Sequence, residues 1–125
     1  MNNREATIRN YIDAYNSFDI DGMMKDMADD VVFENISGGQ VNMTLNGLQA
    51  FRQQAEQAKS YFSSRRQSIT DLMHRGNETE IAIDYEATLA IDLPNGMKVG
   101  DELKLTGQSV FTFEGDKIIA LKDIS

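Results

Sequence analysis

The sequence predicts an α+β domain in which three N-terminal helices pack on a strongly curved mixed or antiparallel sheet. Apolar residues recur at helical spacing in three segments of the first half, and β-branched and aromatic residues alternate with polar ones over most of the second half. Clusters of Gly, Asn and Pro that are typical of tight turns separate the later segments. A curved sheet that wraps helices leaves a conical pocket between the two layers.

Two helices are expected at the start of the chain. Asn2 or Asn3 is a candidate cap for the first, which runs to about Ser17, and Asp19 is the expected cap of the second. Their apolar stripes consist of Ile8, Tyr11, Ile12 and Tyr15, and of Ile20, Met23, Met24 and Met27. Gly22 costs the second helix about 1 kcal/mol relative to Ala, so we expect packing to hold this helix in place.

A first strand and a third helix follow. Asp29-Asp30 breaks the helical pattern, residues 31–36 read as a strand, and residues 41–45 read as a second short strand. Asn46 and Gln49 have the spacing of a capping box, which predicts a helix that begins at this point. The apolar stripe of that helix is Leu48, Phe51, Ala55, Ala58 and Phe62.

The rest of the chain is expected to form strands at about 65–75, 79–93, 98–114 and 117–124. Strict alternation is clearest from Ile81 onward, where one face is apolar and the other mostly polar. That pattern is typical of an antiparallel sheet with one side on the core. Strands of this length must bend or bulge.

Composition narrows the range of functions. The 125 residues fit one domain, residues 1–125, and carry a net charge of −8, which disfavours nucleic acid and anionic membranes as partners. There is no Cys and only one His, so neither a thiolate site nor a His-rich metal site is expected. The N-terminus has no signal-peptide pattern and no apolar run is long enough to span a bilayer, so we expect a cytoplasmic protein.

Several short motifs resemble the nuclear-transport-factor-2-like superfamily, in its SnoaL-like and ketosteroid-isomerase-like branch. They are Tyr11-Ile12-Asp13, Asp19-Ile20-Asp21, Met27-Ala28-Asp29-Asp30-Val31, Phe33-Glu34-Asn35 and, near the end, Phe111-Thr112-Phe113-Glu114-Gly115-Asp116-Lys117-Ile118. The resemblance covers essentially the whole chain. It implies a cystatin-like fold, a pocket for a small hydrophobic molecule, no cofactor, and a homodimer formed through the outer sheet face.

The comparison with ketosteroid isomerases assigns roles to three positions. Tyr11 falls where those enzymes have a tyrosine that donates to an oxyanion, and Ser109 aligns near the Asp that completes their oxyanion hole. Their catalytic base corresponds to Asn35, whose amide cannot accept and return a proton at neutral pH. The resemblance therefore implies that the steroid-isomerase mechanism does not operate in its usual form.

Limonene-epoxide hydrolases give a second comparison. These enzymes are similar in fold and have an aromatic-x-Asn at the end of the first strand, which matches Phe33 and Asn35. An Asp in their last strand resembles Asp123. Their remaining Arg and Asp share the parity of Asp84 and Glu86, where this chain has no Arg.

The candidate catalytic residues are Tyr11, Asn35 and Asp123. The candidate ligand-binding residues are Tyr15, Met27, Phe33, Phe51, Ser109 and Phe111. Each catalytic candidate has a structural alternative: a core tyrosine for Tyr11, a turn cap for Asn35 and a frayed chain end for Asp123. Asp84, Glu86 and His74 are expected to be exposed, with His74 as an alternative base.

These observations favour a cofactor-independent isomerase, cyclase or hydrolase that acts on a small hydrophobic compound by acid–base chemistry. The alternative is a ligand-binding or dimerisation module of the same fold without catalysis. The replacement of the usual base by Asn35 supports that alternative.

Overall fold

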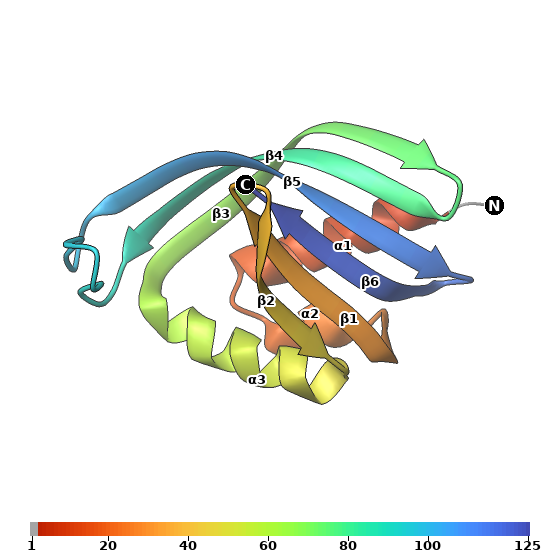
Figure 1. Cartoon of the computed structure of the whole chain (residues 1–125), viewed down its shortest axis with the longest axis horizontal. Coiled ribbons are helices and arrows are strands. Elements are labelled where there is room, and N and C mark those ends of the chain that lie inside the picture. Colours follow the sequence, from red (N-terminus) through yellow and green to blue (C-terminus); the bar gives the residue numbers. More distant parts are fainter. Residues whose placement is uncertain (1–2) are drawn as a thin grey trace.

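A computed structural model describes residues 3–125 as three helices packed on one six-stranded sheet (Figure 1). The helices are α1 (Arg4–Asn16), α2 (Ile20–Met24) and α3 (Leu48–Ala58), the last continued by a 3-10 turn (Lys59–Tyr61). The strands are β1 (Met27–Ser37), β2 (Gln40–Asn46), β3 (Phe62–Arg75), β4 (Glu78–Leu89), β5 (Glu102–Glu114) and β6 (Lys117–Ile124). The predicted α+β class is confirmed.

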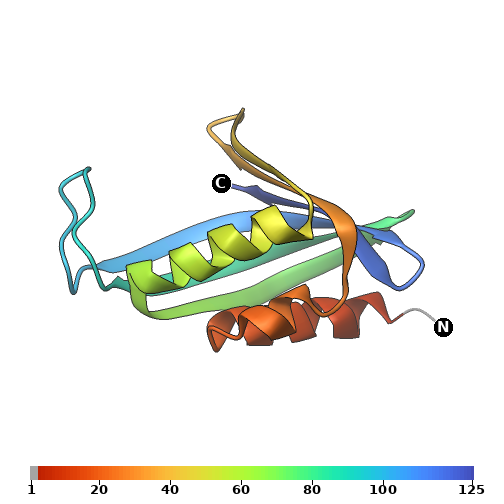
Figure 2. The ribbon, with the colours of Figure 1, turned by 90° about the horizontal axis from the view of Figure 1, so that it is seen from below.

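The strand order places the end of the chain beside its beginning. The sheet has the order β2-β1-β6-β5-β4-β3, and every neighbouring pair is antiparallel except β1 and β6, which run parallel. The sheet arches over the helices in Figure 1, and Figure 2 shows both α1 and α3 in front of the long strands, apart from each other. The helices therefore cover one face of the sheet, and α2 contacts both α1 and α3.

The helix caps follow the sequence in one case and depart from it in another. The Asp19 side chain caps α2 by accepting a hydrogen bond from the Gly22 N–H at 3.0 Å, as predicted. The capping box at Asn46 and Gln49 is wrong, because Asn46 ends β2 and α3 has no side-chain cap. The turn between these elements needs a positive φ, which Gly47 adopts at 94°.

Strand boundaries differ most from the prediction where the chain turns. β1 begins at Met27 and includes Asp29-Asp30, with a register irregularity against β6 that accommodates the polar pair. The expected strands 79–93 and 98–114 are too long, since residues 90–101 form a loop between β4 and β5. Pro94 within that segment lacks the N–H that a sheet ladder would need.

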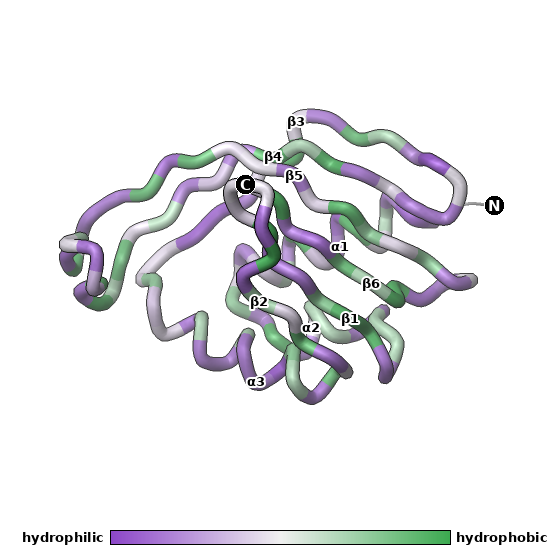
Figure 3. The backbone as a smooth tube through the Cα atoms, viewed as in Figure 1, coloured by the Kyte–Doolittle hydropathy of each residue, from purple (hydrophilic) through white to green (hydrophobic). Residues whose placement is uncertain are grey.

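The core lies between the helices and the inner sheet face. Its fully buried side chains include Ile8 of α1, Val31 of β1 and Leu121 of β6. Figure 3 shows the same separation along the chain, with hydrophilic residues on the outer turns of α3 and alternating colours in the strands. Asp84, Glu86 and His74 are exposed, as predicted. None of the described helices is long and apolar enough to cross a membrane.

We predict that Gly22→Ala destabilises the protein although Ala is the better helix former. A Cβ at this position would lie 2.5 Å from the Asp19 Oδ2 and 2.9 Å from the Ala14 Cβ. The gain of about 1 kcal/mol in helix propensity is smaller than the 1–3 kcal/mol typical of overpacking, so we expect a loss of about 1 kcal/mol. Urea unfolding measures this loss of stability. Gln53→Ala, at an exposed site of α3, is the control. An increase in stability would contradict the prediction.

Candidate functional site

Three polar side chains meet where β1, β6 and β5 run side by side. Asp123 of β6 pairs in register with Asn35 on one side and with Ser109 on the other. Directly paired residues project from the same face of a sheet, so the three side chains form a row. The Ser109 hydroxyl donates a hydrogen bond of 2.7 Å to Asp123 Oδ1, which fixes the orientation of the carboxyl group.

Asn35 and Asp123 of this row lie on the wall of a cavity of about 230 Å³. The cavity is lined by Tyr11, Tyr15, Met23, Phe33, Asn35, Met43, Phe51, Gln54, Ala55, Ala58, Phe62, Arg65 and Asp123. A second cavity of about 190 Å³ shares Tyr15, Asn35 and Asp123 with the first and extends toward Ser109. The shared residues make the two cavities neighbours, and each is smaller than the range of about 300–1,000 Å³ that is typical of small-molecule sites.

Asp123 is the ionisable group whose environment stands out. Burial raises the pKa of this carboxyl to about 6, against an opposing effect of the Ser109 hydrogen bond. The chain end is held in place, because Ser125 N–H donates to the Ile36 carbonyl at 2.9 Å and its own carbonyl accepts from Gly38 N–H at 3.3 Å. The frayed end considered as an alternative for Asp123 is therefore wrong.

Three tyrosines stand near the carboxyl group. Burial raises the pKa of Tyr11 well above its ordinary value, and the nearby Asp123 charge raises this pKa further. The hydroxyls of Tyr15 and Tyr85 are hydrogen-bonded at 3.0 Å, and burial also raises the pKa of both. All three hydroxyls consequently remain protonated at neutral pH, and that of Tyr15 donates to that of Tyr85.

Asn35 occupies the point where β1 changes register against β2. Its Nδ2 donates a hydrogen bond of 2.9 Å to Oδ1 of Asn42 on β2, so the side chain braces the hairpin rather than capping the turn at residues 37–39. The same side chain lines both cavities. It thus places an amide, rather than a second carboxyl, beside Asp123.

The expected ligand-binding residues divide into two groups. Phe33 and Phe51 stack with ring centroids 4.8 Å apart and line the first cavity with Tyr15, whereas Ser109 lines the second. Met27 and Phe111 do not line these cavities. Met27 is 3% exposed and precedes the register irregularity of β1. The Tyr11 ring packs edge-to-face with the Phe111 ring, with the two ring centroids 5.6 Å apart. Both side chains belong to the buried core, so their place in a ligand site stays a prediction.

Sequence reasoning missed the contribution of β3 and β4. Arg65 and Gln67 are only 5% and 7% exposed and, with Tyr85, line the two cavities. Arg65 and Gln67 are two residues apart, so they lie on the same face of β3, and this spacing could have indicated that both face the cavity. Charged and amide side chains are, however, normally assigned to the surface. No cluster of His, Cys, Asp or Glu placed to hold a metal ion is found among residues 3–125.

Solved structures with the same fold include proteins linked to polyketide chemistry. An NTF2-like protein of unknown function from Burkholderia pseudomallei is 19% identical, with a TM-score of 0.80 over 98% of this chain and 90% of that one. A protein from Jannaschia assigned as a SnoaL-like polyketide cyclase is 11% identical, with a TM-score of 0.81 over 95% and 82%. IdmH from Streptomyces antibioticus, assigned as a polyketide cyclase, is 14% identical, with a TM-score of 0.79 over 98% and 91%.

A search of curated proteins gave no significant match. The sequence model of the SnoaL-like domain, by contrast, matches residues 8–121, which include α2, α3, β1 to β5 and the first part of β6; Asp123 lies two residues beyond the match. The resemblance inferred from the motifs is thereby confirmed over nearly the whole chain. This protein belongs to the SnoaL-like domain family.

Proposed function

We propose that this protein is a cofactor-independent enzyme that binds a small hydrophobic compound in the cavity and transfers a proton on it through Asp123. The observation that supports this proposal is the enclosed carboxyl, whose pKa of about 6 suits proton transfer near neutral pH. Its setting, among Tyr11, Phe33 and Phe51, suits an apolar substrate with one polarised oxygen. The polyketide-cyclase assignments of two relatives of the same fold agree with such a substrate.

The arrangement supports a specific sequence of steps. Ionised Asp123 removes a proton from a carbon next to a carbonyl group, and the electron pair moves onto the carbonyl oxygen. The Tyr11 hydroxyl donates a hydrogen bond to this developing oxyanion. In an isomerase, Asp123 returns the proton to another carbon; in a cyclase, the enolate carbon attacks a second carbonyl carbon, whose oxygen then takes the proton.

Asn35 supports the choice of Asp123 as the proton carrier. Two neighbouring carboxyl groups would share one proton and raise each other's pKa, whereas an amide next to Asp123 leaves a single titrating group. The Asn35 Nδ2 is already hydrogen-bonded to Asn42, and this contact fixes the orientation of the Asn35 Oδ1. We assign it the role of orienting the substrate.

The proposal predicts that the protein accelerates exchange of the acidic C–H protons of 2-tetralone in D₂O, a small apolar ketone that forms an enolate. We expect Asp123→Asn to lower the catalysed rate by about 10²–10⁴-fold, because the amide cannot carry the proton. Proton NMR measures the rate. Asp84→Asn, on the exposed outer face of β4, is the matched control and keeps the wild-type rate.

Two results would contradict parts of this proposal. Equal exchange rates for the wild type and Asp123→Asn would remove Asp123 as the proton carrier. Binding of 2-tetralone without any acceleration would instead support the alternative of a non-catalytic ligand-binding module.

The raised pKa of Asp123 also predicts a pH-dependent effect on stability. An aspartate in an unfolded chain has a pKa near 3.9, so between this value and about 6 the folded state binds more protons than the unfolded one. The contribution of Asp123 to stability therefore falls as pH rises through this window. The Asn side chain in Asp123→Asn still accepts from Ser109 but does not ionise.

The stability of Asp123→Asn relative to the wild type should consequently rise by about 1 kcal/mol between pH 5 and pH 8. Urea unfolding at the two pH values measures the difference, and comparison with the wild type cancels the other titrating groups. Asp84→Asn should show no comparable change. A constant difference for Asp123→Asn would show that its carboxyl has an ordinary pKa.

We also propose a homodimer formed through the sheet face that points away from the helices. Half-buried Ala82 and Val110 lie close together on that face, on neighbouring strands β4 and β5. We expect sedimentation equilibrium to give about twice the 14.0 kDa mass of the chain. Val110→Glu should yield monomers, because a charge would be buried in the interface; a monomeric wild type would refute the proposal.

A further inference from the structure

Arg65 is a buried cation in the cavity wall without a negatively charged partner. It lies on β3, is 5% exposed and lines the cavity that also contains Asp123. The four ion pairs within residues 3–125 all involve other side chains. Burying an uncompensated charge is costly, so this position calls for a physical explanation.

Two aromatic rings and one carbonyl group hold the guanidinium in place. Its central carbon lies 3.7 Å from the centre of the Tyr15 ring and 4.5 Å from that of Phe18. Arg65 Nε donates a hydrogen bond of 2.9 Å to the Tyr15 carbonyl, at the end of α1. These contacts stabilise the positive charge by cation–π attraction and fix the plane of the group.

One donor of this group remains unused. Arg65 Nη2 is buried and has no hydrogen-bond partner among the described residues. The link between α1 and β3 is made through Nε, so Nη2 is not needed for it. A buried donor without a protein partner is unusual in a folded protein and leaves Nη2 free to bind a molecule other than the chain itself.

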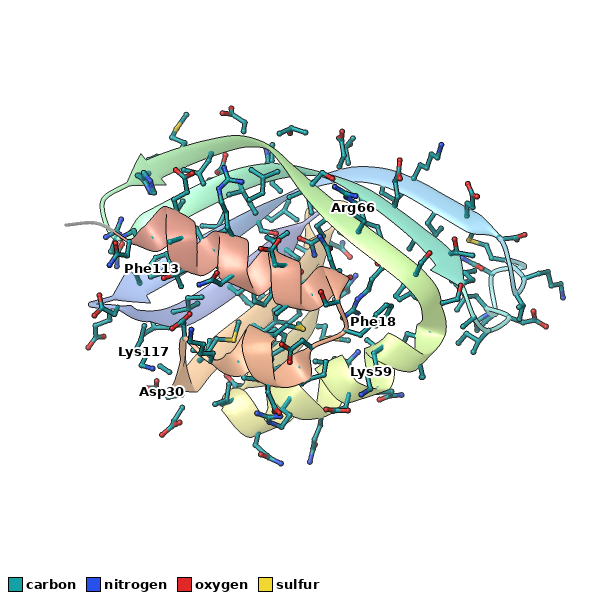
Figure 4. All side chains as sticks on the ribbon, turned by 180° about the vertical axis from the view of Figure 1, so that it is seen from behind. Phe18, Asp30, Lys59, Arg66, Phe113 and Lys117 are labelled. Atoms are coloured by element: carbon teal, nitrogen blue, oxygen red, sulfur yellow. The ribbon has the colours of Figure 1, made fainter. Side chains whose placement is uncertain are left out.

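Phe18 reaches Arg65 from the turn that follows α1. It is the only non-glycine residue with a positive φ, 58°, in the described part of the chain, and a bulky residue in this region is strained. Figure 4 shows Phe18 just beyond the end of α1, in the turn toward α2. Its positive φ belongs to the cap that ends α1, where Phe18 N–H donates to the Tyr15 carbonyl at 3.2 Å and Asp19 N–H donates to the Ala14 carbonyl at 2.8 Å. The same turn places the Phe18 ring against Arg65.

We propose that Arg65 binds an anionic oxygen of the cavity ligand, so that the substrate is a small, mostly apolar compound bearing a carboxylate, an enolate or a phenolate. This inference rests on the proposed use of the cavity as a substrate site and adds the substrate class. Tyr11, Arg65 and Asp123 line the same cavity. An oxygen held by Arg65 therefore orients the ligand toward the proton carrier.

The experiment compares two probes of the same shape, 2-naphthoate and 2-methylnaphthalene, by calorimetry at fixed pH. We expect the wild type to bind 2-naphthoate about tenfold or more tightly than 2-methylnaphthalene, as befits a buried hydrogen bond to a charged group. Arg65→Met should abolish this preference while leaving the affinity for 2-methylnaphthalene unchanged, which also shows that the cavity is intact.

Arg66→Met is the matched control. Arg66 is the next residue of β3, is exposed, and carries the same charge, so its loss should leave the preference for 2-naphthoate unchanged (Figure 4). An equal loss of preference in Arg66→Met would mean that net charge alone attracts the probe, which overturns the proposal.

The remaining outcomes separate this proposal from the proposed function. If both probes bind the wild type equally, or if Arg65→Met keeps the preference, the Arg65 site is refuted and the ligand cavity stands. If neither probe binds, the cavity is not a ligand site and both proposals fail. If Arg65→Met does not fold, two measurements on the wild type replace it: the ratio of the affinities for 2-naphthoate and 2-methylnaphthalene, and the change in the NMR chemical shift of the Arg65 Nε–H when 2-naphthoate is added. The absence of a chemical-shift change refutes the proposal.

Discussion

The parallel pairing of β6 with β1 is the constraint on which the site depends. Without it, Asp123 would lie near a free chain end; with it, the residue is held between β1 and β5 in a continuous ladder. The backbone of Ser125 extends this pairing to the last residue. The polar row is thus set by the central strands of the sheet, the part of a fold that opens least often.

Sequence periodicity predicted the order of the elements and the face on which Asp123 lies, since alternation along a strand fixes the direction of each side chain. It could not predict the β1–β6 pairing, because parallel strands that are far apart in sequence leave no local turn signal. Alternation also predicts on which face of the sheet a side chain lies, but it does not predict whether that side chain is buried in the core or lines a cavity. Phe111 and Ser109 share one face of β5, yet the first lies in the core and the second lines a cavity.

Arg65 shows a different limit of sequence reasoning. Its burial depends on Tyr15 and Phe18, which lie about fifty residues earlier and come together with β3 only in the folded chain. The adjacent Arg66 is exposed, so residue type alone does not separate the two arginines. The fold thereby accepts two unfavourable features near one cavity, an unpaired cation and an enclosed carboxyl, which is typical of sites selected for binding rather than for stability.

The enclosure of Asp123 means that a preparation of this protein is a mixture of two populations. With a pKa of about 6, the protonated and the ionised carboxyl coexist in mild acid, and the ionised form predominates at neutral pH. A reaction that begins with proton abstraction uses the majority population at neutral pH and slows in acid. A reaction that begins with proton donation draws on the minority and accelerates in acid. The direction in which turnover responds to mild acidification therefore identifies the first chemical step.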